Sequence, residues 1–237
     1  MTATAPITRG RQCDTAEIVR ACGLIFEPGQ VTELRALEAT VGGDRFAQTY
    51  SGYFNDWDKL ATAAAAIQTA GNIYIIPNPV NRALLARRVN KIGPAKKSPL
   101  TGDKDIERRR WLLIDCDPIR PAGIASTDAE HEAAIDRAQA IAEDLHARGW
   151  PDPIIGDSGN GGHLMYRIDL PANDGGIVAR ILAALQERFG DDNVEIDQTC
   201  CNPARPWKLY GTLSGKGDAD AAAIGRPQRM ARILDPL

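Results

Sequence analysis

The residues Trp111 to Pro118, W-L-L-I-D-C-D-P, are the most informative part of this sequence. Four consecutive apolar residues predict a buried β-strand, and Asp115 and Asp117 stand at its end. Because side chains alternate faces along a strand, both carboxylates point to one side while Cys116 points to the core. Carboxylates placed in this way can bind one or two divalent cations. Polymerases, phosphatases and sugar transferases all use such a pair, so the pair alone does not select a function.

Length and charge set broad limits on the protein. With 237 residues, 43% of them hydrophobic, the chain can form one large domain or two small ones. Its formal charge of −3 argues against a protein that coats nucleic acid by bulk charge. Residues 82–110 carry ten Lys and Arg against three acids, and residues 127–157 carry eight acids against two Arg. A basic stripe beside an acidic helix can guide a polyanion, although a solvated surface loop explains the stripe equally well.

The cysteines and the absence of a long apolar run predict the compartment. None of the five cysteines forms C-x-x-C, and the adjacent Cys200 and Cys201 make poor disulfide partners, so we expect reduced thiols. No run reaches the roughly 18 apolar residues that span a membrane. The N-terminus, where residues 1–11 form a loose leader, lacks the apolar core of a signal peptide. We therefore predict a cytoplasmic protein with no membrane partner.

The N-terminal half predicts a mixed α/β module. Asp14 and Glu17 mark the start of a short helix over 15–22 that ends at Gly23, and residues 31–37 fit either a helix or a strand. Further expected elements are a strand at 45–50, a helix capped by Asp56 or Asp58 and running to about Ala70, and a strand at 73–76. The loop over 91–101, rich in Lys, Pro and Gly, is the predicted linker. We therefore divide the chain into an N-terminal module, residues 1–107, and a C-terminal module, residues 108–237.

From Trp111 onward the predicted elements follow the order β-α-β-β-α-β, which is the split-βαβ, ferredoxin-like arrangement. Its first helix begins with a capping box of Thr127 and Glu130. In this topology Asp197, at the end of the last strand, can reach the two acids of the opening strand. Three carboxylates and two Mg²⁺ ions would together form a positive site, which suits a triphosphate and an in-line displacement.

Two downstream segments add groups that suit phosphate binding. The turn Ser158 to His163, S-G-N-G-G-H, offers small residues, free backbone N–H groups and an imidazole, although an ordinary glycine hairpin with a surface histidine has the same pattern. Between Arg205 and Arg232 there are six Lys and Arg against two acids. Fork-shaped Arg donors and point-charge Lys both suit triphosphate recognition.

The order of these motifs resembles the archaeo-eukaryotic primase superfamily. The matching segments are L-L-I-D-C-D-P, D-S-G-N-G-G-H-L, V-E-I-D, and N-P-A-R-P-W-K-L-Y-G-T followed by K-G-D. They are most similar to the primase-polymerase domains of phage, plasmid and mobile-element replication proteins. The similarity covers about residues 53–234, and the combination of motifs makes it specific.

The resemblance implies an archaeo-eukaryotic primase fold, in which an N-terminal α/β module packs against a catalytic unit of RNA-recognition-motif type. It implies a DNA primase and polymerase, in which a primer 3′-hydroxyl or a first nucleotide attacks the α-phosphate of a nucleoside triphosphate on a single-stranded DNA template. Asp115, Asp117 and Asp197 would bind two Mg²⁺ or Mn²⁺ ions, and His163 would join them in catalysis. The implied nucleotide-binding residues are Ser158, Gly159, Asn160, His163, Arg205, Lys208, Thr212, Lys216 and Asn78.

This chain departs from the family pattern at Gln228, because relatives often carry the histidine of R-P-H-R at that position. If that histidine contacts the nucleotide in relatives, the replacement puts the contact in question here. Relatives often continue into a helicase, which the resemblance makes an expected partner, either in the same chain or in another protein. Tyr166 and Tyr210 are both candidates for sensing the nucleotide sugar. The sequence does not separate them, so the preference for ribo- or deoxynucleotides stays open.

Two other functions fit parts of the sequence. A haloacid-dehalogenase-type phosphatase also places D-x-D after an apolar strand, and Gly190-Asp191-Asp192 mimics its late acidic motif, but Pro118-Ile119 stands where x-Thr is usual. A replication-initiator or nucleic-acid-binding module would use the same fold without catalysis, although 5% aromatic residues leaves few stacking platforms. Phosphate release from a generic phosphomonoester would indicate the first. Single-strand binding that survives loss of the two strand-end acids would indicate the second.

Overall fold

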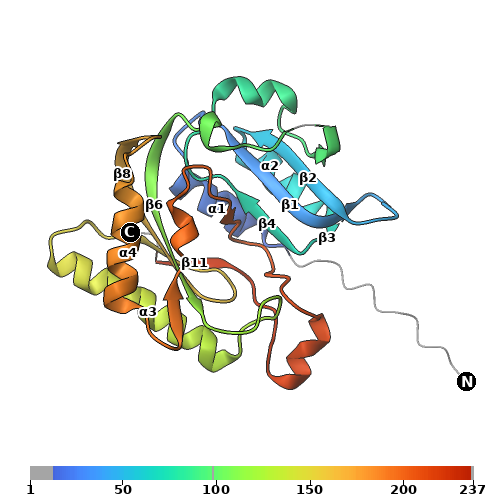
Figure 1. Ribbon diagram of the computed structural model, residues 1–237. Helices are drawn as coiled ribbons and strands as arrows, with labels where there is room; N and C mark the ends of the chain where they lie inside the picture. The colour runs from blue at the N-terminus through green and yellow to red at the C-terminus, as the bar shows by residue number, and fades with distance from the viewer. Residues whose placement is uncertain (1–12, 98, 236–237) are drawn as a thin grey trace, which may run out of the picture.

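The chain folds into two antiparallel β-sheets accompanied by helices, as the computed structural model in Figure 1 shows for residues 13–97 and 99–235. The predicted α/β class is confirmed, and the expected leader over residues 1–11 lies outside the described residues. The α-helices are α1 (Thr15–Ile25), α2 (Trp57–Ala65), α3 (Asp128–Ala147) and α4 (Ile177–Phe189). The 3₁₀ helices are η1 (Arg82–Arg87), η2 (Ala95–Lys97), η3 (Asp103–Asp105), η4 (Gln198–Cys201) and η5 (Ala219–Ile224).

The first sheet has the strand order β10-β4-β1-β2-β5, and β3 pairs with β1 beside that path. Its strands are β1 (Thr32–Val41), β2 (Gln48–Phe54), β3 (Ile67–Thr69), β4 (Asn72–Ile75), β5 (Gly93–Pro94) and β10 (Trp207–Lys208). The N-terminal half supplies all of them except β10, which returns from the C-terminal segment to pair with β4. The division of the chain after residue 107 therefore stays a prediction.

In the N-terminal half, packing decides one alternative that the sequence left open and moves the ends of two predicted helices. Residues 31–37, which fitted a helix or a strand, lie almost wholly in β1, because Leu34 and Ala36 are fully buried between its neighbours. Helix α1 continues through the predicted stop at Gly23 to Ile25, which is buried and whose carbonyl accepts the Trp111 indole N–H at 3.1 Å. Helix α2 ends five residues before the predicted Ala70, because residues 67–69 form β3 against β1.

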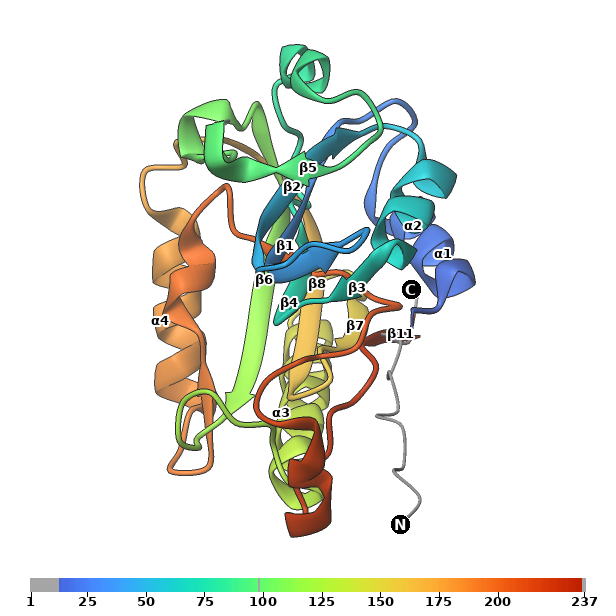
Figure 2. The same ribbon diagram turned by 90° about the vertical axis from the view of Figure 1, so that its right-hand side faces the viewer.

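The second sheet has the order β11-β7-β8-β6-β9 and contains the predicted β-α-β-β-α-β unit. Its strands are β6 (Arg108–Pro118), β7 (Ile154–Asp157), β8 (Gly162–Pro171), β9 (Val194–Ile196) and β11 (Arg232–Asp235). The helices α3 and α4 lie beside this sheet, as Figures 1 and 2 show, and α3 begins with the predicted capping box of Thr127 and Glu130. Strand β6 lies between β8 and β9, so its acidic end is flanked on both sides by neighbouring strands.

The interior of the protein is apolar. Leu112 and Ile114 of β6 are fully buried in one core cluster that also contains α1 and strands of the first sheet. No disulfide joins any of the cysteines in the described part of the chain. In the described part of the chain, no helix combines the length and the apolar character needed to cross a membrane.

The hydrogen bonds of the Asp191 carboxylate should make the stability of the fold depend on pH. Its carboxylate pairs with Arg137 of α3 and accepts the backbone N–H groups of Asn193 and Val194, and these hydrogen bonds lower the pKa of Asp191 to about 2. Since an unfolded Asp has a pKa near 3.9, the stabilisation is present above roughly pH 4 and is lost as the pH falls through about 2.

We expect the difference in unfolding free energy between the wild type and Asp191→Asn to shrink as the pH is lowered across this window. Denaturant unfolding at a series of pH values measures it, with Asp192→Asn, an exposed neighbour, as the matched control. A difference that does not change with pH would contradict the assignment.

Candidate functional site

A polar cavity lies where the end of β6 meets β4 and β10 of the first sheet. Nine of the twelve predicted site residues line it, although they come from segments far apart in the chain. The complete lining is Asn72, Tyr74, Asp115, Asp117, Ser158, Asn160, His163, Asp197, Arg205, Pro206, Trp207, Lys208, Ser214 and Lys216. The cavity therefore brings three acids, a histidine and three cationic side chains together.

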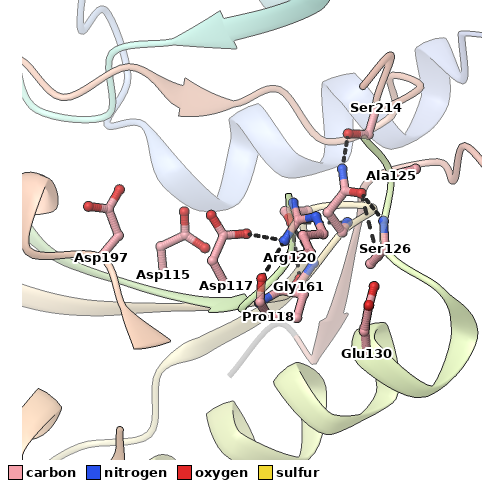
Figure 3. Close-up of polar contacts among 12 residues, drawn as sticks. Asp115, Asp117, Pro118, Arg120, Ala125, Ser126, Glu130, Gly161, Asp197 and Ser214 are labelled. Atoms are coloured by element: carbon pink, nitrogen blue, oxygen red, sulfur yellow. Dashed lines mark hydrogen bonds and ion pairs between the residues drawn. The ribbon is translucent and has the colours of Figure 1, made fainter. Parts of the chain in front are cut away.

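The strand pairing of β6 places the three acids side by side. Asp115 stands opposite His163 of β8, and Asp117 stands opposite Glu195 of β9. Asp197 follows β9, and its backbone N–H donates to the Asp115 carbonyl at 2.9 Å. Figure 3 shows the three carboxyl groups next to one another on the same side of the sheet. The predicted meeting of Asp197 with the two acids of β6 is thus what the geometry shows.

Asp115 and Asp117 have different electrostatic surroundings. Burial by itself would raise the pKa of Asp115, but His163, with smaller contributions from Lys216 and Arg205, lowers it below its ordinary value. Burial, followed by repulsion from Asp115, raises the pKa of Asp117 above its ordinary value. Two neighbouring, partly buried carboxylates resist carrying both negative charges, and a bound cation would remove that resistance.

The carboxylates fit a divalent cation. Oδ1 of Asp115 is buried and accepts no hydrogen bond, and Nε2 of His163 lies 3.5 Å away from it. Ligand atoms of Asp115, Asp197 and Cys200 all lie within 4.8 Å of one another. Carboxylate oxygens suit Mg²⁺ and Mn²⁺, whereas a thiol is a softer ligand that suits ions such as Zn²⁺. In this structure the Arg205 guanidinium pairs with Asp197 and also interacts with Cys200.

The glycine-rich turn is held by its own hydrogen bonds. The Ser158 hydroxyl accepts the N–H groups of Asn160 and Gly161 at 3.2 and 2.9 Å, and the N–H of Gly159 donates to Asp157 at 2.6 Å. The expectation of free backbone N–H groups for phosphate is therefore wrong at these three positions. The turn instead fixes the start of β8 and with it the position of His163.

Asn160 organises the turn from inside. The residue is 3% exposed, and its side chain accepts the N–H of Ser126 at 3.0 Å and donates to Ser214 Oγ at 2.6 Å. It thereby connects the turn with the loop before α3 and with the segment that leads to Lys216. This network holds Lys216 at the cavity wall.

The three cationic side chains of the cavity differ in their burial and in their polar partners. Lys208 is 5% exposed, and its ammonium donates to Asn72 Oδ1 at 3.1 Å and to the Leu213 carbonyl at 2.9 Å. Arg205 faces Asp197, as described above, and Lys216 is only partly buried. Outside the lining, Arg120 lies 3.6 Å from Asp117.

Three predicted nucleotide-binding residues do not line the cavity. Asn78 is 1% exposed; its Oδ1 accepts the N–H groups of residues 110 and 111, and its Nδ2 donates to the Pro203 carbonyl. Thr212 is fully buried and donates to the Leu209 carbonyl at 2.6 Å. A side chain at Gly159, whose φ is +86°, would lie 2.6 Å from a backbone oxygen. These three residues hold backbone segments together. Gln228 is likewise outside the lining and donates to the Gly217 carbonyl.

The structure adds five cavity residues that motif reasoning missed. They are Asn72, Tyr74, Pro206, Trp207 and Ser214. The alternation of strand β4 was a readable signal for Tyr74, since Ile73 and Ile75 on either side of it are buried. Neither candidate for sugar sensing, Tyr166 or Tyr210, lines the cavity, and both are fully buried.

Gly161 packs closely against the backbone of β6 beside the two acids. A Cβ at this position would lie 2.2 Å from the carbonyl oxygen of Cys116, which sits between the two acids of β6. We expect Gly161→Ala to destabilise the protein by about 1–3 kcal/mol through overpacking.

Denaturant unfolding measures the destabilisation expected for Gly161→Ala, and Gly23→Ala is the matched control. Gly23 lies inside α1, and a Cβ added there would have no atom within 4 Å, so Ala at this position should stabilise by roughly 0.5–1 kcal/mol. Equal effects of the two substitutions would contradict the crowding at Gly161.

Comparisons with known proteins give a structural likeness but no match in sequence. No protein-family model matches the chain, and no curated protein matches it. Among solved structures it is similar to the polymerase domain from Mycobacterium tuberculosis Ligase D in complex with DNA, at 15% sequence identity and a TM-score of 0.47. That similarity covers 92% of this chain and 79% of the other. We draw no functional conclusion from a likeness at this level.

Proposed function

We propose that this protein is a template-directed nucleotidyltransferase of the primase-polymerase type, which adds nucleoside triphosphates to a primer or to a first nucleotide. One observation carries the proposal. Asp115 and Asp117 at the end of β6 and Asp197 after β9 converge in a cavity that also holds a histidine and three cationic side chains. This is the combination that a two-cation displacement on a triphosphate needs.

The three carboxylates would hold two Mg²⁺ or Mn²⁺ ions. Their fit is supported by the unpartnered Oδ1 of Asp115 and by the closeness of Asp115 to Asp197. When bound, such ions activate the attacking hydroxyl and neutralise the charge that develops on the leaving pyrophosphate. Asp117, whose ionised form is disfavoured by burial and by Asp115, gains most from a neighbouring positive charge.

The remaining cavity residues suit the triphosphate. Arg205 offers a planar fork of donors that can leave Asp197 for a phosphate. Lys208 is held in place by two hydrogen bonds, so its charge is already oriented before a nucleotide arrives. Lys216 lies on the cavity wall and lowers the cost of bringing in a polyanion.

The test supplies a primed single-stranded DNA template, labelled nucleoside triphosphates, and Mg²⁺ or Mn²⁺. We expect template-dependent extension with release of pyrophosphate, and running ribo- and deoxynucleotides in parallel shows which is preferred. Absence of extension, together with measurable binding of nucleotide, would overturn the proposal. A helicase, in the same polypeptide or as a separate protein, is the proposed further partner.

The alternative functions make different predictions. Asp191, which mimics the late phosphatase motif, is engaged by Arg137 and two backbone N–H groups and does not line the cavity. This argues against the phosphatase, and phosphate release from a generic phosphomonoester tests it. A purely binding module would hold single-stranded DNA equally well after loss of Asp115 and Asp117.

A further inference from the structure

Behind His163 lies a buried chain of hydrogen bonds. The Trp207 indole N–H donates to the Tyr210 hydroxyl at 3.1 Å, and that hydroxyl is 3.0 Å from Nδ1 of His163. The rings of Trp207 and His163 are stacked, with centroids 3.8 Å apart. All three side chains are at most 3% exposed. The imidazole is therefore fixed on one face by stacking and at one nitrogen by a hydroxyl.

The direction of the hydrogen bonds follows from the chemistry of the groups. An indole N–H is a donor only, so the Tyr210 oxygen accepts it and has one proton left to give. His163 Nδ1 is the strong acceptor for that proton, since the other neighbour, Met165 Sδ, is a thioether 4.0 Å away. Burial raises the pKa of Tyr210, so the phenol stays protonated and keeps this proton to donate. With Nδ1 accepting, a neutral His163 carries its proton on Nε2, the nitrogen 3.5 Å from Asp115.

We propose that Tyr210 is a positioning residue that sets the tautomer of His163, so that the histidine presents an Nε2–H donor at the cavity. The part that assigns this donor to a phosphate oxygen of the nucleotide rests on the proposed function. The tautomer itself rests only on the buried contacts. Tyr210 touches neither substrate nor cation and acts through His163.

The strand beside His163 is shaped to admit Tyr210. Gly156 of β7 is the direct partner of His163 in β8. A Cβ at Gly156 would lie 2.5 Å from the Tyr210 hydroxyl and 2.7 Å from its ring. Any larger residue at 156 would therefore push the phenol away from the imidazole. The chain also offers a matched control, because Tyr166 is another fully buried tyrosine, and its hydroxyl has no hydrogen-bond partner among the described residues.

The experiment uses ¹⁵N-histidine NMR on the full chain without nucleotide or template. The chain has three histidines, so the His163 signals are identified by their loss in His163→Gln. We expect the wild type to show a protonated Nε2 and a bare Nδ1 on this ring. We expect Tyr210→Phe to abolish that preference while Tyr166→Phe leaves it intact. Gly156→Ala, which displaces the phenol without removing it, should act like Tyr210→Phe.

Kinetics supply the second readout. Loss of one hydrogen bond that orients the histidine should lower kcat of nucleotide addition by about 5- to 10-fold in Tyr210→Phe, with little change in KM. Tyr166→Phe should match the wild type. Protonation of His163 at Nδ1 in the wild type, or an unchanged nitrogen pattern in Tyr210→Phe, would overturn the inference. A wild type with the expected tautomer but no extension activity would instead overturn the proposed function and leave the tautomer assignment standing.

Discussion

Asp115→Asn and Asp117→Asn are each expected to lower nucleotide addition by about 1000-fold, since several kcal/mol of transition-state stabilisation come from the cations that these carboxylates would hold. Asparagine keeps the size of the side chain and removes its charge. The loss should appear with Mg²⁺ and with Mn²⁺ alike, because both ions need the same carboxylates.

Asp117→Asn should not lower the unfolding free energy, although it lowers activity. This difference separates a loss of catalysis from a loss of folding. Burial and Asp115 disfavour the ionised form of Asp117, as its raised pKa records, so a neutral side chain there relieves repulsion. We therefore expect the unfolding free energy of Asp117→Asn to be no lower than that of the wild type near neutral pH.

Primer extension and denaturant unfolding measured on the same preparations check both statements. Asp192→Asn is the control, since this residue is exposed and lies outside the cavity. Equal extension by the wild type and both cavity variants would remove the two acids of β6 from the mechanism.

Glu33→Ala is expected to cost about 3–5 kcal/mol of unfolding free energy, the range for breaking a buried ion pair by removing one partner. Glu33 of β1 is fully buried, and its carboxylate accepts from Arg35 at 2.8 Å, from Ser51 Oγ at 2.5 Å and from the Thr101 N–H at 2.9 Å. Its removal leaves the largely buried Arg35 guanidinium without its counter-charge, and it leaves the Ser51 hydroxyl and the Thr101 N–H without this acceptor. The loop at Thr101 would also lose its attachment to the first sheet.

Chemical denaturation measures this cost. Glu33→Gln keeps an acceptor oxygen and should fall between the wild type and Glu33→Ala, which separates the charge from the hydrogen bonds. Glu187→Ala on the exposed face of α4 is the matched control and should change stability by less than about 0.5 kcal/mol. A loss below about 1 kcal/mol in Glu33→Ala would show that the pair is not stabilising.

Local pattern was enough to predict the second sheet and its two helices. The apolar run before Asp115 and the capping box at Thr127 each depend on residues within a few positions of one another. Because the β-α-β-β-α-β order implies its own strand order, the meeting of Asp197 with the acids of β6 also followed from the sequence.

The partners of the individual side chains needed the tertiary structure. Trp207 pairs with Ile75 across the first sheet, and Asn78 holds the backbone at Trp111, although nothing near either residue in the sequence indicates its partner. For the same reason the sequence did not indicate that the Ser158 hydroxyl accepts the N–H groups of its own turn, or that the Tyr210 hydroxyl lies beside Nδ1 of His163. Strand periodicity shows which face a side chain occupies, but the atom it meets depends on how distant segments pack, and that is determined by burial and hydrogen bonding over the whole fold.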